Sequence, residues 1–173
     1  MSSVVQAIVS ALSEKIHYSL IVALVSMIPL LELRGSILAA GIMQGIQNNI
    51  LNVQFFPTFI AAVIGNMIPI PFIFLFIEKI FKWMKTTKHF HKIPEKLEEK
   101  AMKKSDQIEK YGYLGLLLFV AIPLPGTGAW TGSLIAVLLG MKPKKSILFI
   151  FMGVVIAGLI MSLVSFGLIR SIL

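Results

Sequence analysis

The chain has 173 residues, 57% of them hydrophobic and 14% charged, with a formal net charge of +8. Soluble domains are usually about 45–50% apolar, and here the excess is gathered in blocks: residues 35–77, 111–141 and 146–169 carry no charged side chain. Because a transmembrane helix needs about 20 apolar residues, these blocks predict membrane segments rather than a soluble core. The chain has no cysteine, which excludes disulfides and thiolate metal sites, and we expect no metal or other cofactor.

The first part of the chain predicts two short elements. Residues 1–14 mix apolar and small polar residues at helical spacing, which indicates an interfacial helix. Residues 16–46 hold two apolar runs separated by Glu32 and Arg34. The first run is marginal as a membrane span and the second is too short, so we predict a re-entrant hairpin, although the sequence leaves open whether this segment dips or spans.

A transmembrane helix is expected at residues 55–78, despite prolines that kink helices. In this span we expect Asn66 to bond a carbonyl freed by a proline rather than to touch substrate. Residues 79–110 follow with ten lysines and five acidic residues. Beside membrane spans such a basic segment is typical of a cytoplasmic loop, and this interpretation is preferred to nucleic-acid binding. Within it, residues 94–110 predict a solvated helix, because acid-first pairs such as Glu99–Lys103 recur four residues apart.

A second hairpin is predicted at residues 111–141. This block is too long for one straight span and short for two, and the prolines and glycines of residues 123–128 break any helix. Lysines flank it on both sides, so both ends face the cytoplasm and the segment must enter and return. Residues 146–170 then form the last transmembrane helix.

The two halves of the chain resemble each other. Ile-Pro-Leu occurs at residues 28–30 and 122–124, and each copy is followed by Gly-Ser, an apolar helix and a full span. The flanking charges give the halves opposite orientations. We therefore predict an all-α integral membrane protein built as an inverted repeat of hairpin plus transmembrane helix, an architecture that places binding sites near the bilayer midplane.

Glu32 and Arg34 are the first candidate site residues, because a charge at membrane depth costs at least about 2.5–3.5 kcal/mol and is a functional candidate by default. Arginine suits a phosphate or carboxylate through two parallel hydrogen bonds, and a buried glutamate can carry a proton. The alternative is a structural pair that staples the hairpin.

A second candidate cluster lies in the second hairpin. Its glycines allow close approach of a ligand to the backbone, its hydroxyls can donate, and its indole can stack. The alternative is a turn without a ligand. The residues are Pro125, Gly126, Thr127, Gly128, Trp130 and Thr131.

The stretches ELRGSI (32–37) and PLPGTGAWTGSLIA (123–136) resemble the small multidrug export protein family, which is similar to the DedA superfamily. The resemblance covers most of residues 15–170. It implies two opposed re-entrant hairpins and movement of lipid phosphates, with acidic and arginine residues at the hairpins. Glu32 and Arg34 match the first hairpin's charged motif, whereas the second hairpin has no arginine, and the nearest basic residue beyond it is Lys142.

We find no nucleophile–base pair, phosphate loop or dinucleotide fingerprint, so an enzyme is disfavoured. We expect a multi-pass transporter of the cell (inner) membrane that moves an anionic lipid or small amphiphile and couples to protons. Export of cationic drugs and a non-transporting scaffold that uses loop 79–110 are the alternatives. The expected partners are the bilayer and the amphiphile, not nucleic acid, and the sequence leaves room for a homo-oligomer.

Overall fold

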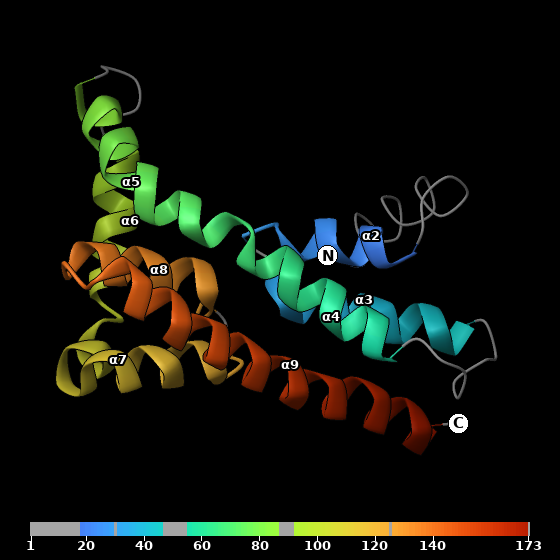
Figure 1. Cartoon of the computed structure of the whole chain (residues 1–173). Helices are drawn as coiled ribbons and strands as arrows, with labels where there is room; N and C mark the ends of the chain where they lie inside the picture. Colours follow the sequence, from blue (N-terminus) through green and yellow to red (C-terminus); the bar gives the residue numbers. More distant parts are fainter. Residues whose placement is uncertain (1–17, 30, 47–54, 87–91, 125, 173) are drawn as a thin grey trace. The chain divides into compact units, whose positions relative to one another are not determined.

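The structure is a computed structural model that describes residues 18–29, 31–46, 55–86, 92–124 and 126–172 (Figure 1). In these ranges the regular secondary structure is helical, as predicted. The interfacial helix expected at residues 1–14 lies outside them. The helices are α2 (Tyr18–Ser26), α3 (Glu32–Ile46), α4 (Phe55–Met67), α5 (Pro69–Thr86), α6 (Lys92–Met102), α7 (Asp106–Ala121), α8 (Ala129–Leu138) and α9 (Pro143–Ile172).

Two stretches of the described chain are long and apolar enough to cross a membrane. They are Phe56–Ile77 and Pro143–Ser165, with mean hydropathies of 2.3 and 2.9. On α4 the exposed side chains include Phe56, Ile60 and Ile64, and on α5 they include Phe72, Phe76 and Ile80. Within each helix this spacing of four forms an apolar outer face, which is typical of a surface that contacts lipid.

The first of these stretches is interrupted where the sequence predicted one helix. Helix α4 ends at Met67, and α5 begins at Pro69. Pro69 has no N–H to donate to the Gly65 carbonyl, so the ladder of helical hydrogen bonds breaks there. Helix α5 then continues to Thr86, well into the segment predicted as a basic loop.

The expected solvated helix at residues 94–110 is also two helices. Helix α6 ends at Met102 and α7 begins at Asp106. The Ser105 hydroxyl lies in the turn, 2.8 Å from the Met102 carbonyl and also bonded to the Glu109 carboxylate. The turn allows Ala101 and Ile108 both to be buried, which explains the break in physical terms.

The chain forms two compact units. Unit 1 comprises residues 1–66 and 156–173, and unit 2 comprises residues 67–155. In unit 1, α2 packs on α3. Helix α4 lies against α2. The two helices approach so closely at Gly65 that a Cβ added there would be 2.2 Å from the Ala23 carbonyl oxygen, and the Ser26 hydroxyl donates to the Ala62 carbonyl at 2.7 Å.

The remainder of unit 1 is the second half of α9. A Cβ added to Gly158 would be 2.7 Å from the Phe59 ring and 3.4 Å from the Leu33 side chain. Ser165 Oγ lies 3.4 Å from the Ile37 carbonyl oxygen. This half of α9 therefore packs on α3 and α4.

Unit 2 is built around the packed helices α7 and α8. Helix α7 bends sharply at Gly112 (φ 57°, ψ −129°), a backbone conformation that favours glycine. The first half of α9 lies on α7. The two helices meet closely at Gly153, where an added Cβ would be 2.8 Å from Val120 Cβ and 2.9 Å from the Leu117 carbonyl oxygen. Helices α5 and α6 pack on α8.

Candidate functional site

The turn between α2 and α3 presents the charged pair. Helix α2 ends at Ser26, three residues before Pro29, because the chain ahead of a proline is biased away from helical geometry. Glu32 then opens α3 with φ 47°, the one positive φ at a non-glycine position in the described chain. Its side chain is buried, with 7% of its surface exposed.

Arg34 follows in the first turn of α3 and is half-buried. It lies close enough to Glu32 for the two charges to attract each other. Residues two apart on a regular helix point to different sides, but Glu32 occupies the left-handed residue that leads into the helix. The partial positive charge at the start of α3 also stabilises the Glu32 carboxylate. The arrangement can bind an anion at Arg34 while Glu32 holds the guanidinium in place.

The second candidate cluster lies in the turn between α7 and α8. Gly126 (φ 76°) and Gly128 (φ 139°) take conformations that favour glycine. The Thr127 hydroxyl lies 2.9 Å from the Ile122 carbonyl oxygen and 2.8 Å from the Leu124 carbonyl oxygen, so it holds the turn together. Pro125 lies outside the described residues.

The first turn of α8 carries the rest of this cluster. Trp130 and Thr131 are half-buried there. Gly132 follows, and a Cβ at this position would be 2.9 Å from Val120 Cγ2. The close approach of α8 to α7 therefore depends on Gly132.

Lys104 places a positive charge at this turn. The sequence did not predict that contact. Its ammonium donates to the Gly126 carbonyl at 2.9 Å from the turn between α6 and α7. The two residues are 22 positions apart, and Lys104 is one lysine of a long basic segment. No local pattern in the sequence signals the contact.

The two candidate clusters belong to different units. Glu32 and Arg34 lie in unit 1, and residues 126–131 lie in unit 2. That all of them complete one cavity stays a prediction. Their positions correspond, however, because Gly35-Ser36 and Gly132-Ser133 each begin three residues after the start of their helix.

The two serines also both bond back to a carbonyl of their own helix, although the two carbonyls are not at equivalent positions. The Ser36 hydroxyl donates to the Leu33 carbonyl at 2.9 Å, and the Ser133 hydroxyl donates to the Ala129 carbonyl at 2.6 Å. Both serines are buried. Counting from the helix starts aligns α3 with α8 without a gap, and the length difference falls in the turns before them. Arg34 then corresponds to Thr131.

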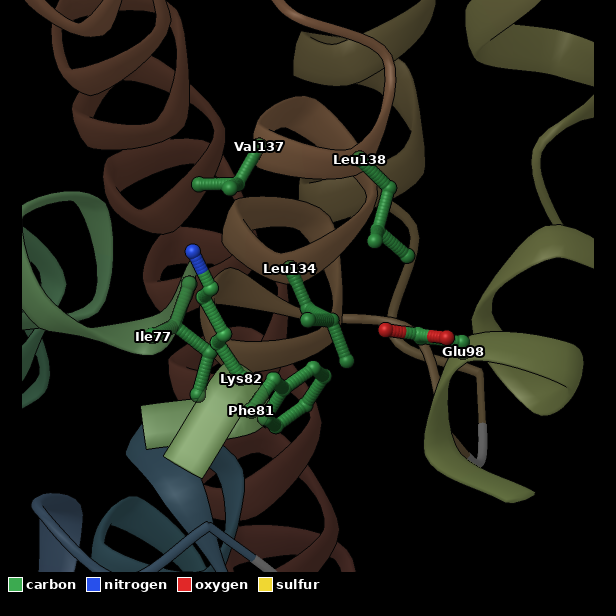
Figure 2. A pocket seen from close by; sticks show the side chains of 7 residues that line it. All are labelled: Ile77, Phe81, Lys82, Glu98, Leu134, Val137 and Leu138. Carbon is green, nitrogen blue, oxygen red and sulfur yellow. The ribbon is translucent and has the colours of Figure 1, made fainter. Parts of the chain in front are cut away.

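Unit 2 also contains an open cleft of about 280 Å³ between α5, α6 and α8. Its walls are apolar apart from one lysine and one glutamate, and in Figure 2 these two charged side chains lie on either side of Leu134. Such a cleft can hold the apolar part of an amphiphile. The lining residues are Ile77, Phe81, Lys82, Glu98, Leu134, Val137 and Leu138.

The charges of α6 are solvated. The Lys103 ammonium donates to the Glu99 carboxylate at 2.6 Å, as the spacing predicted, and this bond lowers the pKa of the Glu99 carboxyl below its usual value. In the described part of the chain, no group of three or more histidine, aspartate or glutamate side chains could hold a metal ion.

Two apolar helical stretches of membrane-crossing length and a buried carboxylate beside a guanidinium are features of a helical membrane protein. A family model described as "Putative small multi-drug export protein" matches residues 32–160. The chain belongs to this family, which confirms the resemblance to small multidrug export proteins, whereas the relation to the DedA superfamily stays a prediction. No curated protein and no solved structure matches the chain. Family membership and the apolar helices indicate a membrane protein, and the family's name favours a transporter over an enzyme.

Proposed function

We propose that the protein is a transporter that moves an anionic amphiphile, such as a lipid phosphate or phospholipid, across the cell (inner) membrane. Arg34 holds the anionic head group and Glu32 couples its movement to protons. The turn at residues 126–131 completes the cavity from the second hairpin, where Lys104 supplies positive charge.

The observation that carries this proposal is the combination of burial, charge and backbone strain at Glu32. The residue is 7% exposed, faces the charge of Arg34 and stands at φ 47°. A buried charge and a left-handed non-glycine residue each cost free energy, about 1–3 kcal/mol for the backbone alone. A staple alone needs neither, because an apolar contact holds two helices at lower cost.

The packing within each unit supports the inverted repeat. In unit 1 a glycine of α4 contacts the first helix of the pair, α2, and the end of α9 packs on the second helix, α3. In unit 2 a glycine of α9 contacts α7, and α5 packs on α8. Each unit thus contains the start of one long apolar stretch and the end of the other.

The length of α8 supports a second hairpin that enters the membrane and returns. Helix α8 has 10 residues, or about 15 Å, against the roughly 30 Å of a bilayer's hydrocarbon core. On this interpretation, loop 79–110 is cytoplasmic, in agreement with the positive-inside rule. A distant relationship to the DedA superfamily agrees with the same architecture.

The proposal is tested with purified protein in liposomes that carry a fluorescent phospholipid or polyprenyl phosphate, by measuring head-group accessibility at the outer leaflet. We expect movement with the wild type, loss with Arg34→Ala and partial recovery with Arg34→Lys. Arg170→Ala, which changes the chain's other arginine, is the matched control and retains movement. Absence of movement with a folded wild type overturns the proposal.

The family's name favours a second candidate, export of cationic drugs, with Glu32 as the counter-charge. In that case Glu32→Gln abolishes transport of a lipophilic cation, whereas Arg34→Ala leaves it largely intact. A scaffold that uses loop 79–110 tolerates both changes and fails when its lysines are neutralised.

A further inference from the structure

Two side chains on α4 each bury a polar atom that has no hydrogen-bond partner in the described part of the chain. Thr58 is 1% exposed and Asn66 is 2% exposed. Thr58 Oγ1 and Asn66 Oδ1 have no hydrogen-bond partner among the residues that the structure describes. Leaving a buried polar atom unpaired costs about 1–3 kcal/mol, and an apolar residue of the same size avoids this cost. The cost calls for a reason other than stability.

The two residues lie on one face of α4, eight positions apart, or about 12 Å along the helix. Between them, Ala62 and Gly65 contact α2 through Ser26 and Ala23. The later residue of α4 meets the earlier residue of α2, so the two helices run antiparallel. The buried face of α4 from Thr58 to Asn66 therefore follows the boundary between the two helices.

One end of this face is level with the charged pair. Phe59, which adjoins Thr58, and Leu33, which lies between Glu32 and Arg34, both contact the same residue of α9, Gly158. The α4 face thus begins beside the turn that holds the charges and leads away from it toward Asn66.

We propose that this face, from Thr58 to Asn66, is the polar path along which the substrate's head group moves after binding at Arg34. This proposal rests on the proposed function. In this structure it is closed by the α2–α4 contact, and transport requires the two helices to separate. The head group supplies the hydrogen bonds that Thr58 and Asn66 lack in the closed state.

The chemistry of the two atoms narrows the substrate class. A carboxamide oxygen only accepts hydrogen bonds, and a hydroxyl donates and accepts. A head group that satisfies Asn66 Oδ1 must therefore carry a donor in addition to its phosphate. Head groups with hydroxyls or an amine meet this requirement, whereas a bare deprotonated phosphate monoester does not.

The contact that closes the path is suited to opening. Its closest points are formed by the small residues Ala23, Ser26, Ala62 and Gly65, which themselves expose little apolar area on separation. The Ser26 hydrogen bond across it can be exchanged for water or a head group.

Water access gives a test that does not require transport. The chain has no cysteine, so single Thr58→Cys and Asn66→Cys variants can be labelled with a small charged thiol reagent in phosphatidylcholine liposomes. Val154→Cys, at an apolar position that is 1% exposed, is the matched control. We expect several-fold faster labelling at residues 58 and 66 than at 154. Equal rates at all three positions overturn the path, whether or not the protein transports.

A second measurement separates a path from a structural role. We expect Thr58→Val and Asn66→Leu to keep or raise the thermal midpoint in detergent, because the Thr58 hydroxyl and the Asn66 carboxamide oxygen have no hydrogen bond to lose, while transport falls several-fold. Ser26→Ala is the contrast, because its hydroxyl is bonded and its loss lowers the midpoint. Lowered midpoints for the two α4 variants with unchanged transport contradict the proposal.

Head-group preference completes the test. At a pH well above the second pKa of a phosphate monoester, about 6, we expect the wild type to move phosphatidylglycerol or phosphatidylethanolamine several-fold faster than phosphatidic acid, and Asn66→Leu to remove this preference. The first two lipids distinguish a hydroxyl from an amine as the donor. Movement of phosphatidic acid at an equal rate overturns the path but leaves the proposed function standing. Rapid labelling at residues 58 and 66 without movement of any lipid overturns the function and leaves a water-accessible path.

Discussion

The backbone N–H of Lys142 donates to the phenolic oxygen of Tyr113 at 3.2 Å. The Tyr113 ring also packs on Phe149, with 5.5 Å between centroids, and Lys145 Nζ lies 5.9 Å from its centre. Tyr113 follows the bend in α7, and Lys142 follows α8. The start of the straight part of α7 and the residue after α8 are therefore in contact within unit 2. The chain from Tyr113 to Lys142 begins and ends at the same point.

We expect Tyr113→Ala to be more destabilising than Tyr113→Phe. The phenylalanine variant loses a long hydrogen bond, worth about 0.5–1.5 kcal/mol at most, and keeps the ring contacts. The alanine variant also loses the packing of a half-buried ring on Phe149, for a total of about 1–3 kcal/mol. Thermal unfolding in detergent checks the order. Equal effects of the two changes would show that the ring contributes little.

Replacing the helix-contact glycines should separate backbone from side-chain clashes. A Cβ at Gly65 meets the Ala23 backbone at 2.2 Å, which cannot yield without moving a helix, whereas a Cβ at Gly132 meets Val120 Cγ2 at 2.9 Å. We expect Gly65→Ala to cost about 1–3 kcal/mol or more and Gly132→Ala to cost less. Combining Gly132→Ala with Val120→Ala should give a less than additive loss, and strict additivity would contradict the contact.

Lys104→Met should loosen the turn between α7 and α8, because it removes the bond from Nζ to the Gly126 carbonyl. We expect faster amide hydrogen exchange in residues 122–128, measured by mass spectrometry. Lys103→Met is the matched control. It removes an exposed pair with Glu99 and should leave exchange in that turn unchanged. The same exchange rates in both variants would remove Lys104 from this role.

The Glu99–Lys103 pair predicts a small pH effect on α6. Lys103 lowers the pKa of the Glu99 carboxyl in the folded protein, so the pair stabilises the helix above the carboxyl's unfolded pKa. This stabilisation is lost as the pH falls through the lowered folded pKa, and salt weakens it. Carbon-13 NMR of the Glu99 carboxyl should show the low pKa, and Lys103→Met should raise it. An unchanged titration in the variant would exclude the pair as the cause.

Backbone strain at Glu32 predicts an unusual order of stabilities. Glu32→Gln and Glu32→Asn both remove the charge, but asparagine tolerates a left-handed backbone better than glutamine does. We therefore expect the asparagine variant to have the higher thermal midpoint, while both lose transport. A lower midpoint for Glu32→Asn would argue against the strained conformation.

Proline, glycine and charge explain what the sequence could predict. The break between α7 and α8 follows from residues 123–128, and the Glu99–Lys103 pair follows from a spacing of four. Glu32 and Arg34 stood out because charges are rare in an apolar block. That reasoning depends on local composition, which the structure preserves.

Contacts between distant positions explain which features could not be predicted from the sequence. The bond from Lys104 to Gly126 joins residues 22 apart. Gly112 bends α7, yet in sequence it resembles the glycines that pack helices together. Thr58 looks neutral in an apolar helix, and what singles it out is a buried hydroxyl that has no partner among the described residues. The expected bond from Asn66 to a freed carbonyl concerns its amide nitrogen and stays a prediction.

Unit 1 is not made from one continuous piece of chain. Residues 1–66 require the segment from residue 156 onward, including Gly158 against Leu33 and Ser165 against Ile37. Unit 2, residues 67–155, is continuous. During synthesis unit 2 can therefore form its contacts first, whereas α3 and the charges it carries must wait until the segment from residue 156 onward has left the ribosome. The helix pair synthesised earlier is thus the one that matures later.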